Sequence, residues 1–441
     1  MGEIAKAYHV RPLAGPFDAT VSVPGSKSQT NRALLLAALA QGRSTLLGAL
    51  FSDDSRVFVE SLMRLGLSVE TDEGASSIGI EGAGGLVPAG AADLFVGNAG
   101  TAARFLTAFL TLGAGEYTLD GVPRMRQRPI GDLIVALNAL GARVESIARN
   151  GCPPVRVHAT GLEGGETSIE ARRSGQFLSA LLMVAPYARR DVVLRLESFL
   201  ASAPYVEMTL TMMRSWGVDV AVSGDPLRAS PDRPAAYHVT AGQRYLASDY
   251  EVAPDASGAS YFLAAAAVTG GHVRVRNLAL ARDQGDLGLL GVFEQMGCRV
   301  VTVGNDVELT GPPQLDGIDV DLNAMSDTTM TLAAIAPFAR GSVTIRNIGH
   351  IREKETDRIA ATVAELRRLG ARVDERSDGL VMYPSALHGA EVQTYDDHRM
   401  AMAFAITGLL VPGISIADPG CVAKTFPDFF ACLDAACGNS V

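Results

Sequence analysis

A polar or glycine-containing start that runs into a helical stretch of small apolar residues occurs six times along the chain. In the first copy, Val23–Leu39, Pro24 and Gly25 precede small polar residues, two cations and an apolar run. Gly25 permits a tight backbone turn, and nearby hydroxyls can satisfy the free amides of a helix start. One copy alone would equally fit an ordinary capped helix. The later copies are Gly97–Gly113, Ser174–Ala188, Asp255–Gly270, Ser326–Gly341 and Asp396–Leu410.

A second marker runs in step with the first, because a helical stretch repeatedly closes on glycine and a short strand follows. These glycines recur about 75 residues apart. They are Gly66, Gly141, Gly217, Gly297 and Gly370. The two markers together predict six units, each read as helix, strand, helix, strand and a further strand.

The pattern gives explicit element boundaries in two of the units. In the second unit we expect helices over 101–112 and 129–140 and strands over 116–120, 142–145 and 155–159. In the fifth unit we expect helices over 330–338 and 355–369 and strands over 342–347, 371–374 and 380–383. Ala-rich stretches at 264–267 and 333–336 predict helices that are buried on all sides.

The last unit stops after a helix over 425–436 and has no closing strand pair of its own. Strands near His9–Val10 and Thr20–Val23 can complete it, which would bring both termini into one domain. With crossings near Pro24 and near Tyr245–Ser248, one domain comprises residues 1–24 and 246–441, and the other residues 25–245. Each domain then holds three units whose apolar helices point inward.

Composition narrows the class of protein. The formal net charge of −10 over 441 residues argues against binding nucleic acid or a membrane surface through bulk electrostatics. Five cysteines without a CxxC pair favour reduced thiols and a cytoplasmic location. The longest apolar stretch, 401–417, is interrupted by glycine and proline, so no membrane span is expected.

Candidate chemistry gathers where the helices are expected to begin. Six helix starts, three per domain, would attract a polyanion if they face a common gap, since each carries about half a positive charge. Arg124, Arg126 and Arg128 would share one side of an extended segment, although a solvated edge is the alternative. Lys354 and Arg358 are spaced i,i+4, and the acids beside them leave a plain ion-pair face as an alternative.

The two remaining cationic stretches also stand at predicted helix starts. Asp396 and Asp397 suit the positive end of a helix dipole, whereas Arg399 does not and so favours an external anion. His398 lacks a second His or Cys at metal-ligand spacing. Lys424 precedes Thr425-Phe426-Pro427-Asp428, which is similar to a capping box.

These motifs give the chain a clear resemblance. The stretches PGSKSQTNRALLLAAL, GNAGTAAR, RMRQRPIGDL, KETDR, DDHRMAM and AKTFPDFF occur in the order typical of the 5-enolpyruvylshikimate-3-phosphate (EPSP) synthase family. The resemblance extends from about residue 12 to residue 433. It implies an α/β fold of two domains, an inside-out α/β barrel of six βαβαββ repeats. It also implies transfer of the enolpyruvyl group of phosphoenolpyruvate to the 5-hydroxyl of shikimate 3-phosphate, with release of phosphate.

The resemblance also implies which residues bind the two substrates. Around shikimate 3-phosphate it places Lys27, Ser28, Arg32, Ser174, Gln176, Tyr205, Asp327, His350 and Lys354. Around phosphoenolpyruvate, or the herbicide glyphosate in its place, it puts Lys27, Gly100, Arg128, Gln176, Glu355, Arg358, His398, Arg399 and Lys424. No metal or organic cofactor, no nucleic acid and no membrane is implied, and a monomer with small-molecule substrates is expected.

The catalytic roles follow from the same resemblance. Addition and elimination through a tetrahedral intermediate require a proton acceptor for the hydroxyl and a proton donor for the methylene carbon. Asp327 is the candidate acceptor, Glu355 the candidate donor, and Lys27 assists the leaving phosphate. The division of labour among the three is a hypothesis.

The chain departs from the family pattern at three positions. Gly175 replaces a phosphate-binding serine, His350 replaces asparagine, and Phe105 replaces the proline common after Arg104. Gly100 predicts glyphosate sensitivity, which a shift of its helix by the bulky Phe105 would reduce.

Two other functions remain as alternatives. The sister enzyme that transfers enolpyruvate to UDP-N-acetylglucosamine shares the fold, but most of its members carry a reactive cysteine in a loop of the first half. The one cysteine in that half, Cys152, lies away from the RMRQRP segment. A non-catalytic scaffold for phosphorylated ligands would not need Asp327 and Glu355 beside the cations.

Overall fold

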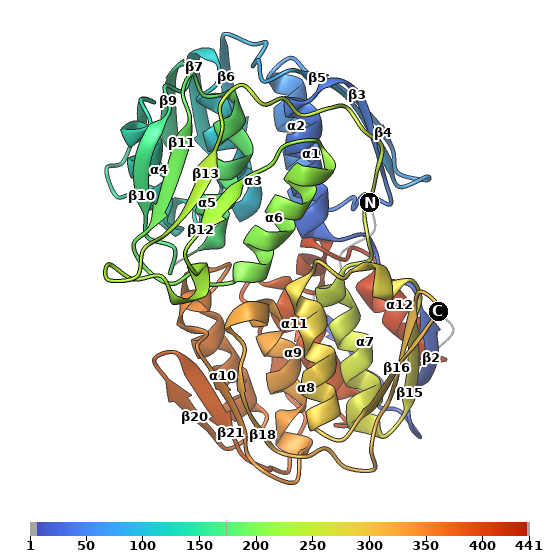
Figure 1. Ribbon diagram of the computed structural model, residues 1–441. Helices are drawn as coiled ribbons and strands as arrows, with labels where there is room; N and C mark the ends of the chain where they lie inside the picture. The colour runs from blue at the N-terminus through green and yellow to red at the C-terminus, as the bar shows by residue number, and fades with distance from the viewer. Residues whose placement is uncertain (1–6, 173, 439–441) are drawn as a thin grey trace. The chain divides into compact units, whose positions relative to one another are not determined.

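A computed structural model describes residues 7–172 and 174–438 (Figure 1). Its contacts divide the chain after Pro24 and after Val252 into two compact units. We call Gly25–Val252 the central unit, and the segments before and after it together the terminal unit. Residues 246–252, which the sequence assigns to the other domain, therefore belong to the central unit.

The central unit contains three four-stranded sheets. Its helices are α1 (Lys27–Leu39), α2 (Asp53–Arg64), α3 (Gly100–Leu110), α4 (Gly131–Ala139), α5 (Gly175–Val184) and α6 (Ala203–Ser215). Its strands are β3 (Gln41–Leu47), β4 (Ser68–Asp72), β5 (Ser77–Ala83), β6 (Ala91–Phe95), β7 (Ala114–Asp120), β8 (Val144–Ser146), β9 (Val155–Thr160), β10 (Gly165–Ile169), β11 (Val192–Leu196), β12 (Ala221–Ser223), β13 (Ala235–Val239) and β14 (Tyr250–Glu251).

Each of these sheets has the same order of parallel and antiparallel pairs. In the second sheet, β6 pairs with β7 in parallel, and β9 lies antiparallel between β7 and β8. The third sheet repeats this order with β10, β11, β13 and β12. With a helix after each of its first two strands, each of these two repeats is βαβαββ.

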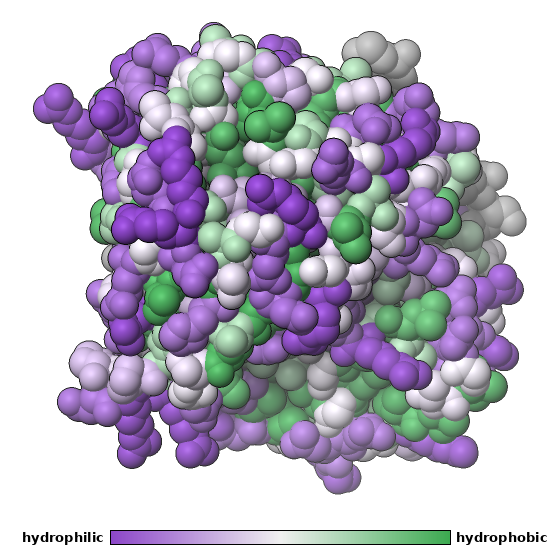
Figure 2. All heavy atoms as spheres, turned by 45° about the horizontal axis from the view of Figure 1, so that its top comes forward, coloured by the Kyte–Doolittle hydropathy of each residue, from purple (hydrophilic) through white to green (hydrophobic). Residues whose placement is uncertain are grey.

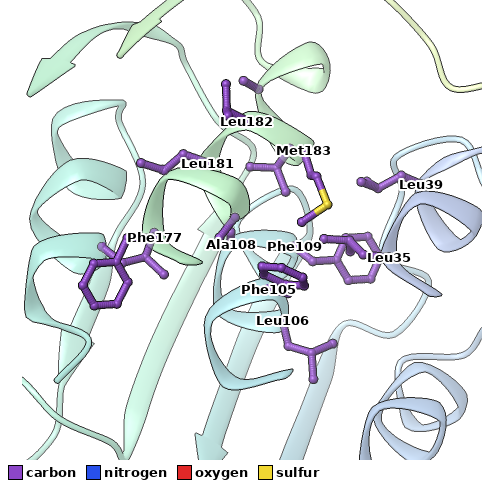
Figure 3. Packing of buried hydrophobic residues seen from close by; sticks show 14 of the residues in the cluster. Leu35, Leu39, Phe105, Leu106, Ala108, Phe109, Phe177, Leu181, Leu182 and Met183 are labelled. Atoms are coloured by element: carbon purple, nitrogen blue, oxygen red, sulfur yellow. The ribbon is translucent and has the colours of Figure 1, made fainter. Parts of the chain in front are cut away.

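Helices lie inside the central unit and sheets outside it (Figure 1). The first helix of each repeat is buried around most of its circumference, because leucine, alanine and phenylalanine occupy nearly every position after its first turn. Leu35 of α1, Phe105 and Phe109 of α3, and Leu181 and Met183 of α5 meet in the resulting core (Figure 3). This packing fixes the starts of α1, α3 and α5 relative to one another.

Among the described residues, the terminal unit contains two four-stranded sheets and one three-stranded sheet. Its helices are α7 (Ala256–Thr269), α8 (Leu289–Gln295), α9 (Thr329–Ile335), α10 (Arg358–Arg368), α11 (His398–Gly408) and α12 (Phe429–Ala436). Its strands are β1 (Ala7–His9), β2 (Asp18–Val21), β15 (His272–Val275), β16 (Arg299–Val303), β17 (Asp306–Thr310), β18 (Ile318–Asp321), β19 (Val343–Arg346), β20 (Val373–Arg376), β21 (Gly379–Met382), β22 (Glu391–Val392) and β23 (Ser415–Ala417). The Ala-rich parts of α7 and α9 are buried, as their composition predicts.

The strands beside the two crossings are exchanged between repeats, although each pairs within its own unit. β2 precedes α1 in the chain but pairs in parallel with β15, while β14 precedes α7 but pairs in parallel with β3. β1 pairs with β23 and completes the last sheet, as expected for His9–Val10. The expectation that Thr20–Val23 completes the same sheet is wrong, because β2 belongs to the sheet of the fourth repeat. Period and polarity identify a strand, but they do not identify its partner.

The surface carries no extended apolar face in the view of Figure 2, where hydrophilic side chains predominate and hydrophobic ones lie between them. Among the described residues, no helix is both long and apolar enough to cross a membrane. All five cysteines are free thiols.

Candidate active site

The start of α1 holds the first group of predicted site residues. Ser26 caps the helix by accepting a hydrogen bond from the Gln29 amide. The Lys27 ammonium lies 3.5 Å from the carboxylate of Asp54, which is almost fully buried. The sequence did not single out Asp54, since an acid in the first turn of a helix has an ordinary capping role.

Arg32 is a buried cation one turn further along α1, with only 2% of its surface exposed. Its Nε donates to Thr209 Oγ1 at 2.8 Å, its Nη2 to the Tyr205 carbonyl at 2.8 Å, and its Nη1 to the Ser28 carbonyl at 3.0 Å. The Phe105 ring centroid lies 5.5 Å from its Cζ, a cation–π distance. Three of the predicted residues, Ser28, Arg32 and Tyr205, are therefore in direct contact.

A second cation, Arg128, lies against the start of α3. Its Nη1 donates to the Asn98 carbonyl at 2.8 Å. A Cβ on Gly100 would lie 2.4 Å from Arg128 Nη2, so the absent side chain leaves room for this guanidinium. Arg104 donates from Nη1 to the Gly100 carbonyl at 3.1 Å, and so also contributes to this buried group.

The extended segment predicted for Arg124, Arg126 and Arg128 is wrong. Residues Met125–Gln127 form a short 3₁₀ helix instead. Arg124 donates to Gln127 and Arg126 forms an ion pair with Asp120, so only Arg128 is buried. The solvated-edge alternative describes the first two.

Ser174 and Gln176 lie at the start of α5. The Ser174 hydroxyl accepts a hydrogen bond from the Gln176 amide at 3.2 Å, and Gln176 Nε2 donates to Thr101 Oγ1 on α3 at 3.4 Å. The second contact joins the starts of two repeats. A Cβ on Gly175 would lie 3.1 Å from a methyl of Val206, so the site has little room for the hydroxyl that the family usually carries there.

Asp327 is the centre of the predicted residues in the terminal unit. Its Oδ1 accepts from Arg358 Nη1 at 3.0 Å and its Oδ2 from Arg399 Nη2 at 2.7 Å. Both arginines are buried. The Asp327 carboxylate therefore lies between two buried guanidinium groups.

Arg358 binds two further carboxylates. Its Nε lies 2.7 Å from Asp397 Oδ2, and its Nη2 lies 2.9 Å from Glu355 Oε2. Burial opposes the charge of this guanidinium, but Asp397, Glu355 and Asp327 outweigh that effect and raise the pKa of Arg358. Both candidate proton carriers, Asp327 and Glu355, therefore share one fixed cation.

The helical i,i+4 relation expected for Lys354 and Arg358 is wrong. Lys354 follows the 3₁₀ helix Gly349–Glu353, and α10 begins only at Arg358. Asp357 caps α10 by accepting from the Ala360 amide at 3.0 Å, and its carboxylate also binds Arg352. Because this cap lies two residues after the predicted helix start at residue 355, the helix begins later than the hydrophobic period indicated.

His350 lies next to this cluster. Its Nε2 is 2.9 Å from Ser326 Oγ, one residue before Asp327. Burial first, and then the charge of Lys354, lower the pKa of His350 to about 4. The imidazole is therefore neutral at pH 7, and its Nε2 can exchange one hydrogen bond with a hydroxyl.

His398 and Arg399 form the start of α11, which Asp397 caps through the Arg399 amide at 3.0 Å. The side chains of His398 and Arg399 are both buried. His398 Nδ1 lies 3.5 Å from Asp397 Oδ1. Lys424, also buried, ends a 3₁₀ helix over Pro419–Lys424. The capping box predicted after it is wrong, because α12 begins at Phe429 and Asp428 makes no side-chain capping bond.

Asp286 is a buried carboxyl that the sequence did not reveal. Ser257 donates to it from α7, and burial followed by the charge of Asp327 raises its pKa to about 6. A single Asp after Gln284-Gly285 carries no signal that separates it from a loop residue. Within the described ranges, no group of three or more His, Cys, Asp or Glu side chains is placed to hold a metal ion.

The predicted residues are divided between the two units, and we call those of each unit the central group and the terminal group. The central group contains Lys27, Ser28, Arg32, Gly100, Arg128, Ser174, Gln176 and Tyr205. The terminal group contains Asp327, His350, Lys354, Glu355, Arg358, His398, Arg399 and Lys424. That the two groups act on one ligand pair stays a prediction.

Comparison with known proteins assigns the chain. Residues 13–433 match the family model described as EPSP synthase (3-phosphoshikimate 1-carboxyvinyltransferase). The 3-phosphoshikimate 1-carboxyvinyltransferase of Nostoc punctiforme is 54% identical over 95% of this chain and 96% of its own length. The chloroplastic enzyme of that name from Arabidopsis thaliana is 48% identical over 96% of this chain and 83% of its own length.

Solved structures agree on the fold. An EPSP synthase from Acinetobacter baumannii matches with a TM-score of 0.78 over 98% of each chain at 24% identity. Six repeats, two groups of buried cations and these comparisons lead to one assignment. The chain belongs to the EPSP synthase family.

Proposed function

We propose that this protein transfers the enolpyruvyl group of phosphoenolpyruvate to the 5-hydroxyl of shikimate 3-phosphate and releases phosphate. The observation that carries the proposal is the buried pairing of Asp327 with Arg358 and Arg399, with Glu355 on the same Arg358. Binding a carboxylate in this way costs desolvation free energy, so a purely structural role would be served better by apolar residues. Relatives at 54% identity carry the name of this activity.

The charges of the two groups fit two substrates that each carry a phosphate and a carboxylate. We assign Ser28, Arg32, Ser174, Gln176 and Tyr205 to shikimate 3-phosphate, together with Asp327, His350 and Lys354 of the terminal group. We assign Gly100, Arg128, Gln176, Glu355, Arg358, His398, Arg399 and Lys424 to phosphoenolpyruvate, and Lys27 to both. Arginine suits these groups because its planar fork donates two hydrogen bonds to one anion.

The reaction then has two successive steps, an addition and an elimination, and each step includes two proton transfers. Asp327 accepts the proton of the 5-hydroxyl as its oxygen bonds to C2 of phosphoenolpyruvate, while Glu355 protonates the methylene carbon. In the elimination, the new methyl group returns a proton to Glu355, the bond from C2 to the phosphate oxygen breaks, and the proton held by Asp327 leaves with the phosphate, which Lys27 stabilises. Arg358 holds both carboxylates, so it also fixes the geometry of both transfers.

Because the assigned residues lie in both units, we infer that the units come together on the substrates and exclude water from them. We also propose that the active species is a monomer in the cytoplasm. The net charge of −10 and the free thiols are consistent with this location. No metal or organic cofactor enters this scheme.

Phosphate release tests the proposal. The purified protein is incubated with phosphoenolpyruvate and shikimate 3-phosphate, with UDP-N-acetylglucosamine replacing the second substrate in a parallel reaction. Phosphate release in the reaction with shikimate 3-phosphate, and not in the reaction with UDP-N-acetylglucosamine, supports the proposal. Release with UDP-N-acetylglucosamine would favour the sister activity, and release with neither would favour a phospho-ligand scaffold.

A substitution tests the role of Glu355. Glu355→Gln keeps the size of the side chain but removes its acid, so turnover should fall by about 10²–10⁴-fold, the usual contribution of general acid–base catalysis. The dissociation constant of shikimate 3-phosphate, measured by calorimetry, should stay within about twofold, since Glu355 is assigned to the other substrate. An unchanged turnover number would remove Glu355 from the scheme.

A further inference from the structure

The segment Gln393–Asp397, which leads into α11, has an unusual backbone. Tyr395 and Asp396 have φ values of 56° and 55°, so two successive residues other than glycine adopt the left-handed conformation. Each such residue is disfavoured, because its Cβ comes too close to the following carbonyl oxygen. Asp397 and Arg399 follow at once, and their place depends on this turn.

One face of α10 holds the segment at both of its ends. Arg358, the first residue of α10, binds the Asp397 carboxylate at the end nearer α11. Glu365 lies two turns later on the same face and binds the beginning of the segment. Its Oε1 accepts from the Tyr395 hydroxyl at 2.6 Å, and its Oε2 accepts from the Gln393 amide at 3.0 Å.

Glu365 is fully buried although it is a carboxylate. A buried carboxylate is costly unless donors surround it, and here Arg368 supplies a third donor at 2.9 Å. These contacts do not touch the residues assigned to substrate. They constrain only the path of the chain from β22 to α11.

We infer that Glu365 and Tyr395 are positioning residues, which hold the left-handed turn and thereby set Arg399 against Asp327 and Asp397 against Arg358. The inference deepens the proposed function and rests on it, because Arg399 is assigned to phosphoenolpyruvate. Loss of either contact lets the turn relax, and the start of α11 then moves relative to α10.

The test uses Tyr395→Phe, which removes one hydroxyl, and Glu365→Gln, which removes the charge. Tyr383→Phe is a matched control, because the Tyr383 hydroxyl also donates to a carboxylate, that of Asp374, at 2.9 Å in the same unit. For Tyr395→Phe and Glu365→Gln, we expect KM for phosphoenolpyruvate to rise about threefold to tenfold, the loss carried by one hydrogen bond. KM for shikimate 3-phosphate should change less than KM for phosphoenolpyruvate in these two variants, and neither KM should change by more than about twofold in Tyr383→Phe.

Hydrogen exchange gives a readout that does not depend on activity. The amides of Asp397 and Arg399 are bonded within the turn, to Thr394 and Asp397, so a peptide covering this turn should exchange faster in both variants and not in Tyr383→Phe. If the wild type releases no phosphate, the proposed function fails, but the exchange data still test whether Glu365 and Tyr395 hold the turn. If Tyr395→Phe matches Tyr383→Phe in both exchange and KM, the inference is overturned. A double variant no worse than either single one would support a shared role for the pair.

Discussion

At the residue scale, the absence of a side chain at Gly100 leaves space for the Arg128 guanidinium. Gly100→Ala would place a Cβ 2.4 Å from Arg128 Nη2, and the flexible end of Arg128 would have to move. We expect KM for phosphoenolpyruvate to rise, and the inhibition constant of glyphosate to rise further, because the longer inhibitor has less freedom to adjust. Steady-state inhibition kinetics of both forms check this, and equal glyphosate inhibition would contradict the placement of Gly100.

His350 links the site to stability at low pH. Its pKa falls from 6.5 in the unfolded chain to about 4 in the folded protein. Between these values the unfolded state binds the extra proton, so the folded protein loses stability as the pH falls from 6.5 towards 4. Above pH 6.5 the contribution is fully present.

The variant His350→Asn isolates this effect. The difference in the free energy of unfolding between wild type and variant should be constant above pH 6.5, and should change by up to about 1.4 kcal/mol per pH unit below it. Urea denaturation between pH 4.5 and 7.5 measures the difference. A pH-independent difference would show that His350 titrates normally in the folded protein.

The sequence singled out cations that the structure shows buried, among them Arg32, Arg128, Arg358 and Arg399, because motif and repeat position coincide there. Their roles toward substrate stay predictions. The sequence did not single out two buried acids, Asp54 and Asp286. Asp54 and Asp286 look like ordinary loop or first-turn acids, and only burial distinguishes them. The three arginines of RMRQRP alternate in sequence, but a 3₁₀ turn sends only Arg128 inward.

At the element scale, the cap of α10 decides where the site helix begins. Asp357 accepts from the Ala360 amide and also binds Arg352. Asp357→Ala should lower the free energy of unfolding by about 1–2 kcal/mol, whereas Asp357→Asn, which retains the cap, should lose less than half of that. Equal losses in the two variants, measured by urea denaturation, would show that the ion pair with Arg352 matters more than the cap.

The period of apolar residues predicted the buried helices well, since α1, α3, α5 and α7 repeat one composition. Their boundaries agree within a few residues where a glycine or proline marks the end. The period misplaced the starts of α10 and α12, which lie at Arg358 and Phe429. At both starts irregular turns precede the helix, and hydrophobicity does not distinguish a 3₁₀ turn from an α-helix.

At the scale of the whole molecule, the division of the assigned residues between two units predicts a measurable change in shape. If both groups bind shikimate 3-phosphate, the ligand should draw the units together and reduce the radius of gyration. Small-angle scattering with and without the ligand measures this. The variant Lys354→Ala, which removes a ligand contact from the terminal unit only, should compact less at the same ligand concentration, and no change in the wild type would contradict closure.

The six-part repeat was evident in the sequence, whereas the exchange of strands was not. β2 and β14 each lie directly before a buried helix, as the first strand of every repeat does. β2 lies just before the first crossing and β14 just before the second, so β2 pairs with β15 in the terminal unit while β14 pairs with β3 in the central unit. Neighbouring positions in sequence favour the opposite choice.

The exchange also has a consequence for how the polypeptide becomes ordered during translation. The ribosome releases β1 and β2 first, but their partners β23 and β15 come far later, so these strands wait while the central unit forms. Tyr8 also stacks on Phe430 and donates to Asp434, which keeps the two chain ends together. A circular permutant that begins at Gly25 would therefore encode each unit as one uninterrupted segment, with a single covalent passage between them instead of two.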